Sequence, residues 1–227
     1  MKKNICALIA VRAGSKRVIN KNIRPFAGKS LLEIKINSVK EVDGIEEIFV
    51  SSDDDSMLRL SESLGAIPVK RDPYYASDHV PMSEVYVHMA ESLNCDHIAY
   101  LNVTSPLLKT KTLKDCVSLY NSFKNEYDSL ATVNVIREYM WLDEKAINYD
   151  PKNHPRSQDL PEIYGLNFAA CILPRELMIS KRNIIGDRFY KLETSQEESV
   201  DIDTMLDFQI AEFIYKRTYS RWMEDEG

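Results

Sequence analysis

The stretch ICALIAVRAGSKRVINKNIRPFAGK (Ile5–Lys29) decides the fold, because it joins a buried strand to a basic loop. Its apolar run, residues 5–11, is typical of a strand covered on both faces. Small residues in the loop let backbone N–H groups approach an anion, and cations neutralise that anion. Open α/β sheets hold nucleotides directly after their first strand, so this loop predicts a phosphate site. The loop contains Gly14 and Ser15 and, without any acid, five cations: Arg12, Lys16, Arg17, Lys21 and Arg24.

The motifs that this loop lacks narrow the kind of phosphate site. No Gly-Lys-Ser/Thr follows four residues after a glycine, and Gly-x-Gly-x-x-Gly is absent. The generic phosphate loops are therefore excluded, and a triphosphate cradle built mainly from Arg and Lys side chains remains. The alternative is a basic loop that is simply solvated.

Charge and composition limit the class of protein. The 227 residues carry a formal net charge of −6, which argues against a general nucleic-acid binder. No apolar segment approaches the ~20 residues of a membrane span, and no signal peptide is recognised. The four cysteines are scattered without a C-x-x-C pair. We therefore expect a single cytoplasmic domain (residues 1–227) without disulfides or structural zinc, and with neither nucleic acid nor membrane as partner.

Strands and helices alternate along the first 135 residues. Ser30 and Glu33 form the pattern of a capping box at the start of the first helix. This rhythm implies right-handed parallel crossovers, and therefore an α/β fold with a Rossmann-like, mostly parallel sheet flanked by helices. The expected strands are 5–11, 45–51, 66–70, 97–103 and 129–135, and the expected helices are 30–42, 56–64, 82–93 and 110–123.

The pattern changes after residue 136. Residues 148–161 form a loop with three prolines, and the apolar run 163–173 predicts a further strand. We interpret residues 137–190 as an insertion that carries small antiparallel strands within the one domain. A final helix is expected over residues 204–222, where apolar residues recur at helical spacing.

Asp201-Ile202-Asp203 directly precedes that last helix. Carboxylates at positions i and i+2 of an extended chain point the same way, so both can reach one hard cation. Mg²⁺ takes one or two carboxylates together with phosphate oxygens and water, and the pair therefore predicts a magnesium site. The alternative is that Asp203 is simply the N-cap of the following helix.

Polar residues at other expected strand ends allow two interpretations each. Arg71 directly follows the third strand and is either an anion ligand or a surface arginine. Asn102, Thr104 and Ser105 follow the fourth strand, and they either hydrogen-bond a base or sugar edge or cap a turn. The acids at residues 53–55 are better explained as helix caps, because they would repel a triphosphate.

Taken together, these segments resemble the CMP-sialic acid synthetases, also called acylneuraminate cytidylyltransferases. Five motifs of that family occur in order over nearly the whole chain, and five in order are far more specific than one. The motifs are Arg12-Ala13-Gly14-Ser15-Lys16 with Lys21-Asn22, Val50-Ser51-Ser52-Asp53, Arg71-Asp72-Pro73 with Ala76-Ser77-Asp78, Asn102-Val103-Thr104-Ser105-Pro106-Leu107, and Asp201-Ile202-Asp203 with Asp207-Phe208 and Ala211-Glu212.

The resemblance implies transfer of CMP from CTP to the anomeric hydroxyl of a 2-keto sugar acid, with release of pyrophosphate. It also implies a homodimer in which residues 137–180 reach into the partner. Arg12, Lys21 and Asp201 would act in the chemical step, where cations neutralise the phosphates and Asp201 or a metal-bound water accepts the proton. The matched residues would hold CTP (Arg12, Ser15, Lys16, Lys21, Asn22 and Arg71) and Mg²⁺ (Asp201 and Asp203).

The motifs on the sugar side depart from the family pattern. Asn102-Val103 stands where the family has Gln-Pro, and Asn167-Phe168-Ala169 where it has Asn-Gly-Ala. An arginine that is common just upstream of that asparagine is missing. We therefore expect a sugar acid other than N-acetylneuraminate, such as a dideoxy-diamino relative or an octulosonate. The alternatives are a non-catalytic nucleotide-binding relative, a retaining-type glycosyltransferase and a sugar-1-phosphate nucleotidylyltransferase. The residues expected to bind the sugar acid are Asn102, Thr104, Ser105, Asn167 and Phe168.

Overall fold

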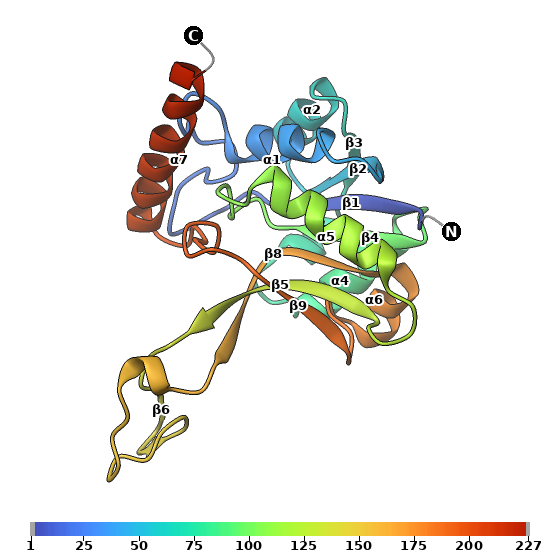
Figure 1. Ribbon diagram of the computed structural model, residues 1–227. Coiled ribbons are helices and arrows are strands. Elements are labelled where there is room, and N and C mark those ends of the chain that lie inside the picture. The colour runs from blue at the N-terminus through green and yellow to red at the C-terminus, as the bar shows by residue number, and fades with distance from the viewer. Residues whose placement is uncertain (1–2, 226–227) are drawn as a thin grey trace.

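Seven strands form one sheet, in the order β3-β2-β1-β4-β8-β5-β9 (Figure 1). The computed structural model describes the backbone of residues 3–225 and the side chains through Thr218. The strands are β1 (Ile5–Ala10), β2 (Ile45–Ser52), β3 (Ile67–Lys70), β4 (His97–Leu101), β5 (Ser129–Ile136), β8 (Ile163–Pro174) and β9 (Phe189–Glu193). The helices are α1 (Leu31–Lys40), α2 (Asp55–Ser63), α3 (Pro73–Ala76), α4 (Met82–Glu91), α5 (Thr110–Ser122), α6 (Arg175–Lys181) and α7 (Met205–Asp225).

The sheet is mostly parallel, as the alternation of elements predicts. The pairs β1–β2, β1–β4, β2–β3 and β5–β9 run parallel. Strand β8 lies between β4 and β5 and runs antiparallel to both. Its direction could not be predicted, because a buried apolar run has the same pattern in either orientation.

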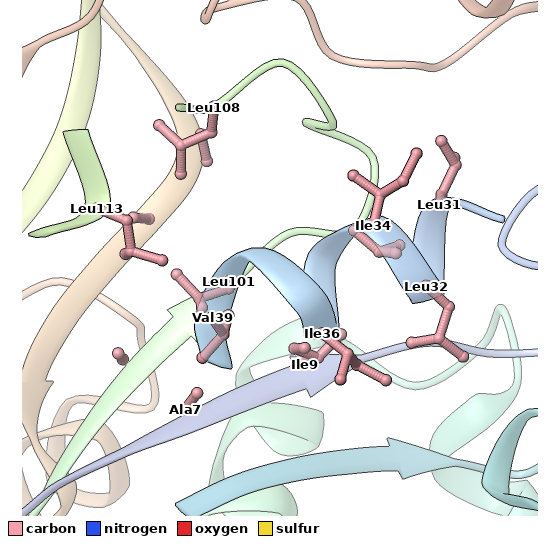
Figure 2. Close-up of a cluster of buried hydrophobic side chains, with 14 of the residues drawn as sticks. Ala7, Ile9, Leu31, Leu32, Ile34, Ile36, Val39, Leu101, Leu108 and Leu113 are labelled. Carbon is pink, nitrogen blue, oxygen red and sulfur yellow. The ribbon is translucent and has the colours of Figure 1, made fainter. Parts of the chain in front are cut away.

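Helix α1 begins and packs as its sequence predicts. The Ser30 hydroxyl accepts a hydrogen bond from the Glu33 backbone N–H, and the Glu33 carboxylate accepts one from the Ser30 N–H, which confirms the capping box. Figure 2 shows the apolar side of α1, including Ile36 and Val39, near Ile9 of β1, in the same buried cluster.

Two layers of helices cover the two faces of the sheet. Helices α1, α5 and α7 contribute Leu32, Leu113 and Phe208 to one buried cluster. Helices α4 and α6 contribute Met89 and Met178 to the other. Within residues 3–225, no helix is long and apolar enough to cross a membrane.

Residues 137–162 project from the body of the protein, and we call them the arm (Figure 1). The arm carries the small antiparallel pair β6 (Trp141–Leu142) and β7 (Lys145–Ala146) and the 3₁₀ turn η1 (Ser157–Asp159). The projecting part is shorter than the expected insertion, 137–190. The rest of that range forms β8, α6 and the start of β9, which belong to the main sheet and its covering layer.

The structure pairs Cys6 with Cys95 as a disulfide, so the expectation of no disulfide is wrong. Strand β1 lies beside β4 with Ile5 opposite His97, which brings the two cysteine Cα atoms to 6.2 Å. That separation lies within the range that a disulfide spans. The cysteines are 89 positions apart in the sequence, and their spacing therefore gives no sign of the pairing.

Candidate active site

The candidate site lies at the carboxyl edge of the parallel strands, where the loop after β1 crosses the sheet. The Val11 N–H donates to the Ser51 carbonyl (3.0 Å) and extends the contact of β1 with β2. The Ala13 N–H donates to the Asp53 carboxylate (3.0 Å), which fixes the start of the loop. Asp54 caps α2 through the N–H groups of residues 56 and 57, as expected for this acidic segment.

Asn22 supports the same loop from beneath. It is buried, and its side-chain amide donates to the Arg12 carbonyl (3.1 Å) while its own carbonyl accepts from the Leu32 N–H (3.1 Å). Gly14 has a φ of +76°, a conformation that glycine adopts without strain, and the half-exposed Ser15 follows it. Asn22 therefore shapes the loop, and its predicted contact with nucleotide stays a prediction.

Two of the predicted phosphate ligands converge on one carboxylate. Arg12 Nη2 lies 2.6 Å from Asp78 Oδ1, and Lys16 Nζ lies 2.7 Å from Asp78 Oδ2. Arg12 Nη1 also donates to the Ala76 carbonyl (2.8 Å). The neighbouring Lys16 and Arg12 lower the pKa of Asp78 to about 2, so the carboxylate is ionised at neutral pH. An anionic ligand would compete with Asp78 for both cations, a role that could not be predicted for Asp78 from the sequence.

Lys21 joins the loop to the acidic pair near the C-terminus. Its Nζ donates to the Ile202 carbonyl (2.6 Å), between Asp201 and Asp203 and 181 positions away in the sequence. Desolvation lowers the pKa of the half-buried Lys21, and the charges of Asp201 and Asp203 oppose that shift. Arg17 forms an ion pair with Asp203 (2.8 Å). In Figure 1, α7 accordingly lies beside the loop that follows β1.

The two acids differ in their surroundings. The Asp201 carboxylate reaches solvent but lies among protein atoms, and this desolvation raises its pKa. A hydrogen bond with the Thr104 side chain lowers that pKa, whereas the nearby Asp203 charge raises it. Asp203 does not cap α7, so that alternative is wrong. Thr204 and Asp207 cap the helix reciprocally, with Asp207 Oδ2 accepting from the Thr204 N–H at 2.7 Å and the Asp207 N–H donating to Thr204 Oγ1 at 3.3 Å.

The acidic pair is compatible with a hard divalent cation. Asp201 and Asp203 flank Ile202 in the sequence, each charge affects the other acid or Lys21, and neither carboxylate caps the helix. The described residues contain no cluster of three or more His, Cys, Asp or Glu that could enclose a metal. Two carboxylates fit Mg²⁺ in a site where substrate phosphates and water complete the coordination.

Arg71 lies inside the protein, so the surface-arginine alternative is wrong. It is 4% exposed, and its Nη2 donates to the carbonyls of Val11 and of Ser51, the latter at 3.0 Å. Its Nε has no hydrogen-bond partner within the described chain. Burial lowers the pKa of Arg71. The guanidinium therefore joins the ends of β1 and β2, and contact with nucleotide stays a prediction.

The polar residues after β4 support the acidic pair. The Ile202 N–H donates to the Thr104 carbonyl (2.9 Å), and the Thr104 side chain hydrogen-bonds Asp201. Ser105 is buried, and its carbonyl accepts a hydrogen bond from Lys35 Nζ (2.9 Å). Lys35 lies in α1 and was missed by sequence reasoning, because a lysine in an amphipathic helix is normally on the solvent side. The half-exposed Asn102 lies at the end of β4, beside this turn.

Asn167 and Phe168 lie where β8 passes the end of β4. Leu101 pairs with Ala170, so the two residues lie just beyond the last residue of β4. The Asn167 side chain is held by Thr132 (2.6 Å) and Thr194 (2.8 Å). Phe168 has a φ of +53°, the left-handed region that favours glycine, and its ring is half-buried against the cluster beneath α4. Their predicted contact with a sugar acid stays a prediction.

A basic loop that faces a carboxylate pair, at the carboxyl edge of a mostly parallel sheet, defines a nucleotide-binding α/β protein of the nucleotidyltransferase class. Residues 6–154 match the model of a family described as "Cytidylyltransferase", which is more than half of the chain. The chain therefore belongs to the cytidylyltransferase family.

Curated relatives align over most of the chain. A pseudaminic acid cytidylyltransferase of Campylobacter jejuni is 28% identical over 225 residues, which are 94% of this chain and 97% of the relative. An N-acylneuraminate cytidylyltransferase of Oncorhynchus mykiss is 28% identical over 220 residues, or 93% of this chain. The match covers 50% of that relative, so this chain spans about half of its length.

Solved structures confirm the fold. A CMP:2-keto-3-deoxy-manno-octonic acid synthetase, solved in complex with CTP, superposes with a TM-score of 0.71 at 14% identity over 95% of this chain and 99% of that chain. A 4-diphosphocytidyl-2C-methyl-D-erythritol synthase from Anaerococcus prevotii gives a TM-score of 0.66 at 12% identity, over 95% of this chain and 97% of that chain. At these identities the likeness is one of fold.

Proposed function

We propose that this protein transfers CMP from CTP to the anomeric hydroxyl of a 2-keto-3-deoxy sugar acid, releases pyrophosphate and requires Mg²⁺. The observation that carries the proposal is the position of Lys21, on the carbonyl between Asp201 and Asp203. It joins a cationic loop to a pair of metal-compatible carboxylates at the edge of the sheet where nucleotides bind. Membership of the cytidylyltransferase family supports CTP as the nucleotide.

The reaction balances with groups that the site contains. The sugar hydroxyl attacks the α-phosphorus of CTP, a new P–O bond forms, and the bond to the bridging oxygen of the β-phosphate breaks. Pyrophosphate leaves with the negative charge that develops, which Lys21 and Arg12 neutralise. The hydroxyl proton passes to the carboxylate of Asp201, which acts as the general base.

Asp201 and Asp203 would hold the Mg²⁺ ion of this site. When bound, such an ion supplies further charge neutralisation at the phosphates. Before CTP enters, Arg17 and Lys21 partly neutralise the two carboxylates, and Asp78 partly neutralises Arg12 and Lys16. Both sets of charges are therefore held near the edge of the sheet and become available when phosphate and metal enter together.

The sugar acid is proposed to be a nonulosonate or an octulosonate other than N-acetylneuraminate. Two features support this: the C. jejuni relative that matches nearly end to end is a pseudaminic acid cytidylyltransferase, and Phe168 stands where the resembling family has glycine. We propose that the exposed part of the half-buried Phe168 ring gives the acceptor side an apolar surface. Such a surface favours an acceptor with fewer hydroxyl groups.

The proposed quaternary state is a homodimer that the arm joins. The arm exposes Trp141 (53%), Leu142 (65%) and Ile147 (53%), although they are large apolar side chains. Several exposed apolar residues on one projecting segment are typical of a protein–protein contact.

The test is pyrophosphate release from CTP with Mg²⁺, measured across a panel of 2-keto sugar acids that includes pseudaminic acid, N-acetylneuraminate and an octulosonate. UTP and ATP serve as controls for the base. We expect release with CTP and with one acid other than N-acetylneuraminate. Absence of release with every acid would contradict the proposal, and N-acetylneuraminate as the best substrate would contradict the acceptor assignment alone.

A further inference from the structure

A lysine lies in the interior of the helix layer, beneath the candidate site. Lys35 is in the middle of α1 and is only 2% exposed. Its helix neighbours Ile34 and Ile36 belong to the buried apolar cluster that covers the sheet. Among the described residues, Lys35 Nζ donates one hydrogen bond, to the Ser105 carbonyl (2.9 Å).

This ammonium group is held at an energetic disadvantage. No carboxylate within the described side chains lies close enough to form an ion pair with Lys35. Desolvation lowers the pKa of Lys35 to about 8, and the charge of Asp201 acts against that shift. For stability alone, an apolar side chain of similar length would serve this position better. A residue that violates the pattern of its element in this way is expected at a functional site.

The contacts of Lys35 lead to the acidic pair. Its ammonium fixes the Ser105 carbonyl, and the adjacent Thr104 accepts the Ile202 N–H at its own carbonyl (2.9 Å). The Thr104 side chain hydrogen-bonds Asp201. The turn at residues 104–105 therefore rests on α1 at one end and carries the segment with Asp201 at the other.

We infer that Lys35 is a positioning residue for Asp201. Lys35 holds the 104–105 turn in place, and it supplies a buried positive charge behind the site of the divalent cation and the CTP phosphates. This inference rests on the proposed function. Groups behind the direct ligands of a metal set the orientation of those ligands, and their removal commonly weakens metal affinity by about 10–100-fold. Lys35 contacts no reacting atom in this arrangement, so its action is through Thr104, Ser105 and Asp201.

The test compares Lys35→Met with the wild type and with the matched control Lys114→Met. Lys114 is an exposed lysine of α5, outside the site. Three quantities are measured: the unfolding temperature of the protein without ligands, the affinity for Mn²⁺ in the presence of CTP by electron paramagnetic resonance of the free ion, and pyrophosphate release as a function of Mg²⁺. Lys35→Gln is included because it removes the charge but keeps a hydrogen-bond donor.

We expect Lys35→Met to unfold at the wild-type temperature or above it, and to lose about tenfold or more in Mn²⁺ affinity and in turnover at limiting Mg²⁺. Lys35→Gln should lose Mn²⁺ affinity as well, and Lys114→Met should match the wild type. Unchanged Mn²⁺ affinity in Lys35→Met would overturn the inference. A fall in unfolding temperature with proportionate losses of affinity in both Lys35 variants would also overturn it, because that pattern indicates a structural role.

The readouts separate this inference from the proposed function. If the wild type releases no pyrophosphate with any sugar acid, the proposed reaction fails, yet the Mn²⁺ comparison between wild type and Lys35→Met still decides the role of Lys35. A wild type that does not bind Mn²⁺ with CTP would overturn the inference.

Discussion

At the scale of single residues, the two carboxylates of the acidic pair are not equivalent. Asp201 is bound by Thr104 and has a raised pKa, whereas Asp203 is 52% exposed and pairs with Arg17. The pair therefore combines a carboxylate that the protein surrounds with a more exposed one that pairs with a loop cation.

We predict that Asp201→Asn lowers the turnover of pyrophosphate release by about 100-fold or more, because the amide neither accepts the proton nor binds the cation as a carboxylate does. The measurement is steady-state release at saturating CTP. Asp43→Asn is the matched control, since Asp43 is an exposed aspartate in the turn before β2. Near-normal turnover in Asp201→Asn would exclude Asp201 as the proton acceptor.

Lys35 predicts an unusual dependence of stability on pH. Its pKa falls from 10.5 in the unfolded chain to about 8 in the folded protein, so the unfolded state binds more protons between these values. Stability from this group is therefore fully present above pH 10.5 and is lost as the pH falls through about 8. At about 1.4 kcal/mol per pKa unit, the loss approaches ~3 kcal/mol.

The measurement is the free energy of unfolding by urea at several pH values for wild type and Lys35→Met. We expect the variant to be the more stable protein at pH 7 and its advantage to shrink as the pH rises toward 10.5, since neutral Lys35 no longer carries the desolvation penalty. A difference between the two proteins that stays constant with pH would show that Lys35 has an ordinary pKa.

At the scale of elements, β8 combines a regular strand with one strained position. Phe168 interrupts the pairing of β8 beside β5, where the register shifts between Ala131 and Val133. A left-handed conformation raises the energy of a residue with a Cβ by about 1–2 kcal/mol relative to glycine. The half-buried ring offsets this strain by packing against the cluster beneath α4.

We predict that Phe168→Gly is more stable than Phe168→Ala by about 1 kcal/mol, because both lose the ring but only glycine relieves the strain. Within a strand, glycine normally makes a protein less stable than alanine does, so the predicted order of stability is reversed here. The control is Ala169→Gly at the next position, which is buried and has no positive φ, and which should destabilise the protein. Urea unfolding decides the order, and a more stable Phe168→Ala would contradict the strain argument.

At the scale of the whole molecule, the arm and the sheet differ in how they bury their apolar side chains. The sheet buries its apolar residues within the chain, whereas the arm leaves Leu142 65% exposed.

We predict a dimer in solution and expect Leu142→Glu to shift it toward monomer, because a charge is costly to bury at a contact. Light scattering gives the mass. The matched control is Leu206→Glu on α7, since Leu206 is 63% exposed outside the arm. A monomeric wild type would contradict the dimer.

Much of the fold could be predicted from local patterns. The apolar runs give β1, β2 and β4, and the Ser30–Glu33 box gives the start of α1. The cations of the loop could also be recognised as a site, since five positive charges without an acid are conspicuous in an acidic chain. These features can be predicted from the sequence because backbone preference and amphipathic period depend on neighbouring residues.

Local sequence patterns predict most of the strands and helices, the basic loop and the candidate carboxylates. The packing of distant segments decides that Lys21 bonds the backbone carbonyl between those two acids, that Asp78 pairs with the loop cations, and that Lys35 is buried beneath the 104–105 turn. It also decided that Thr204, rather than Asp203, caps α7. Burial and charge pairing depend on which distant segments pack together, and a pattern of neighbouring residues does not predict those long-range contacts.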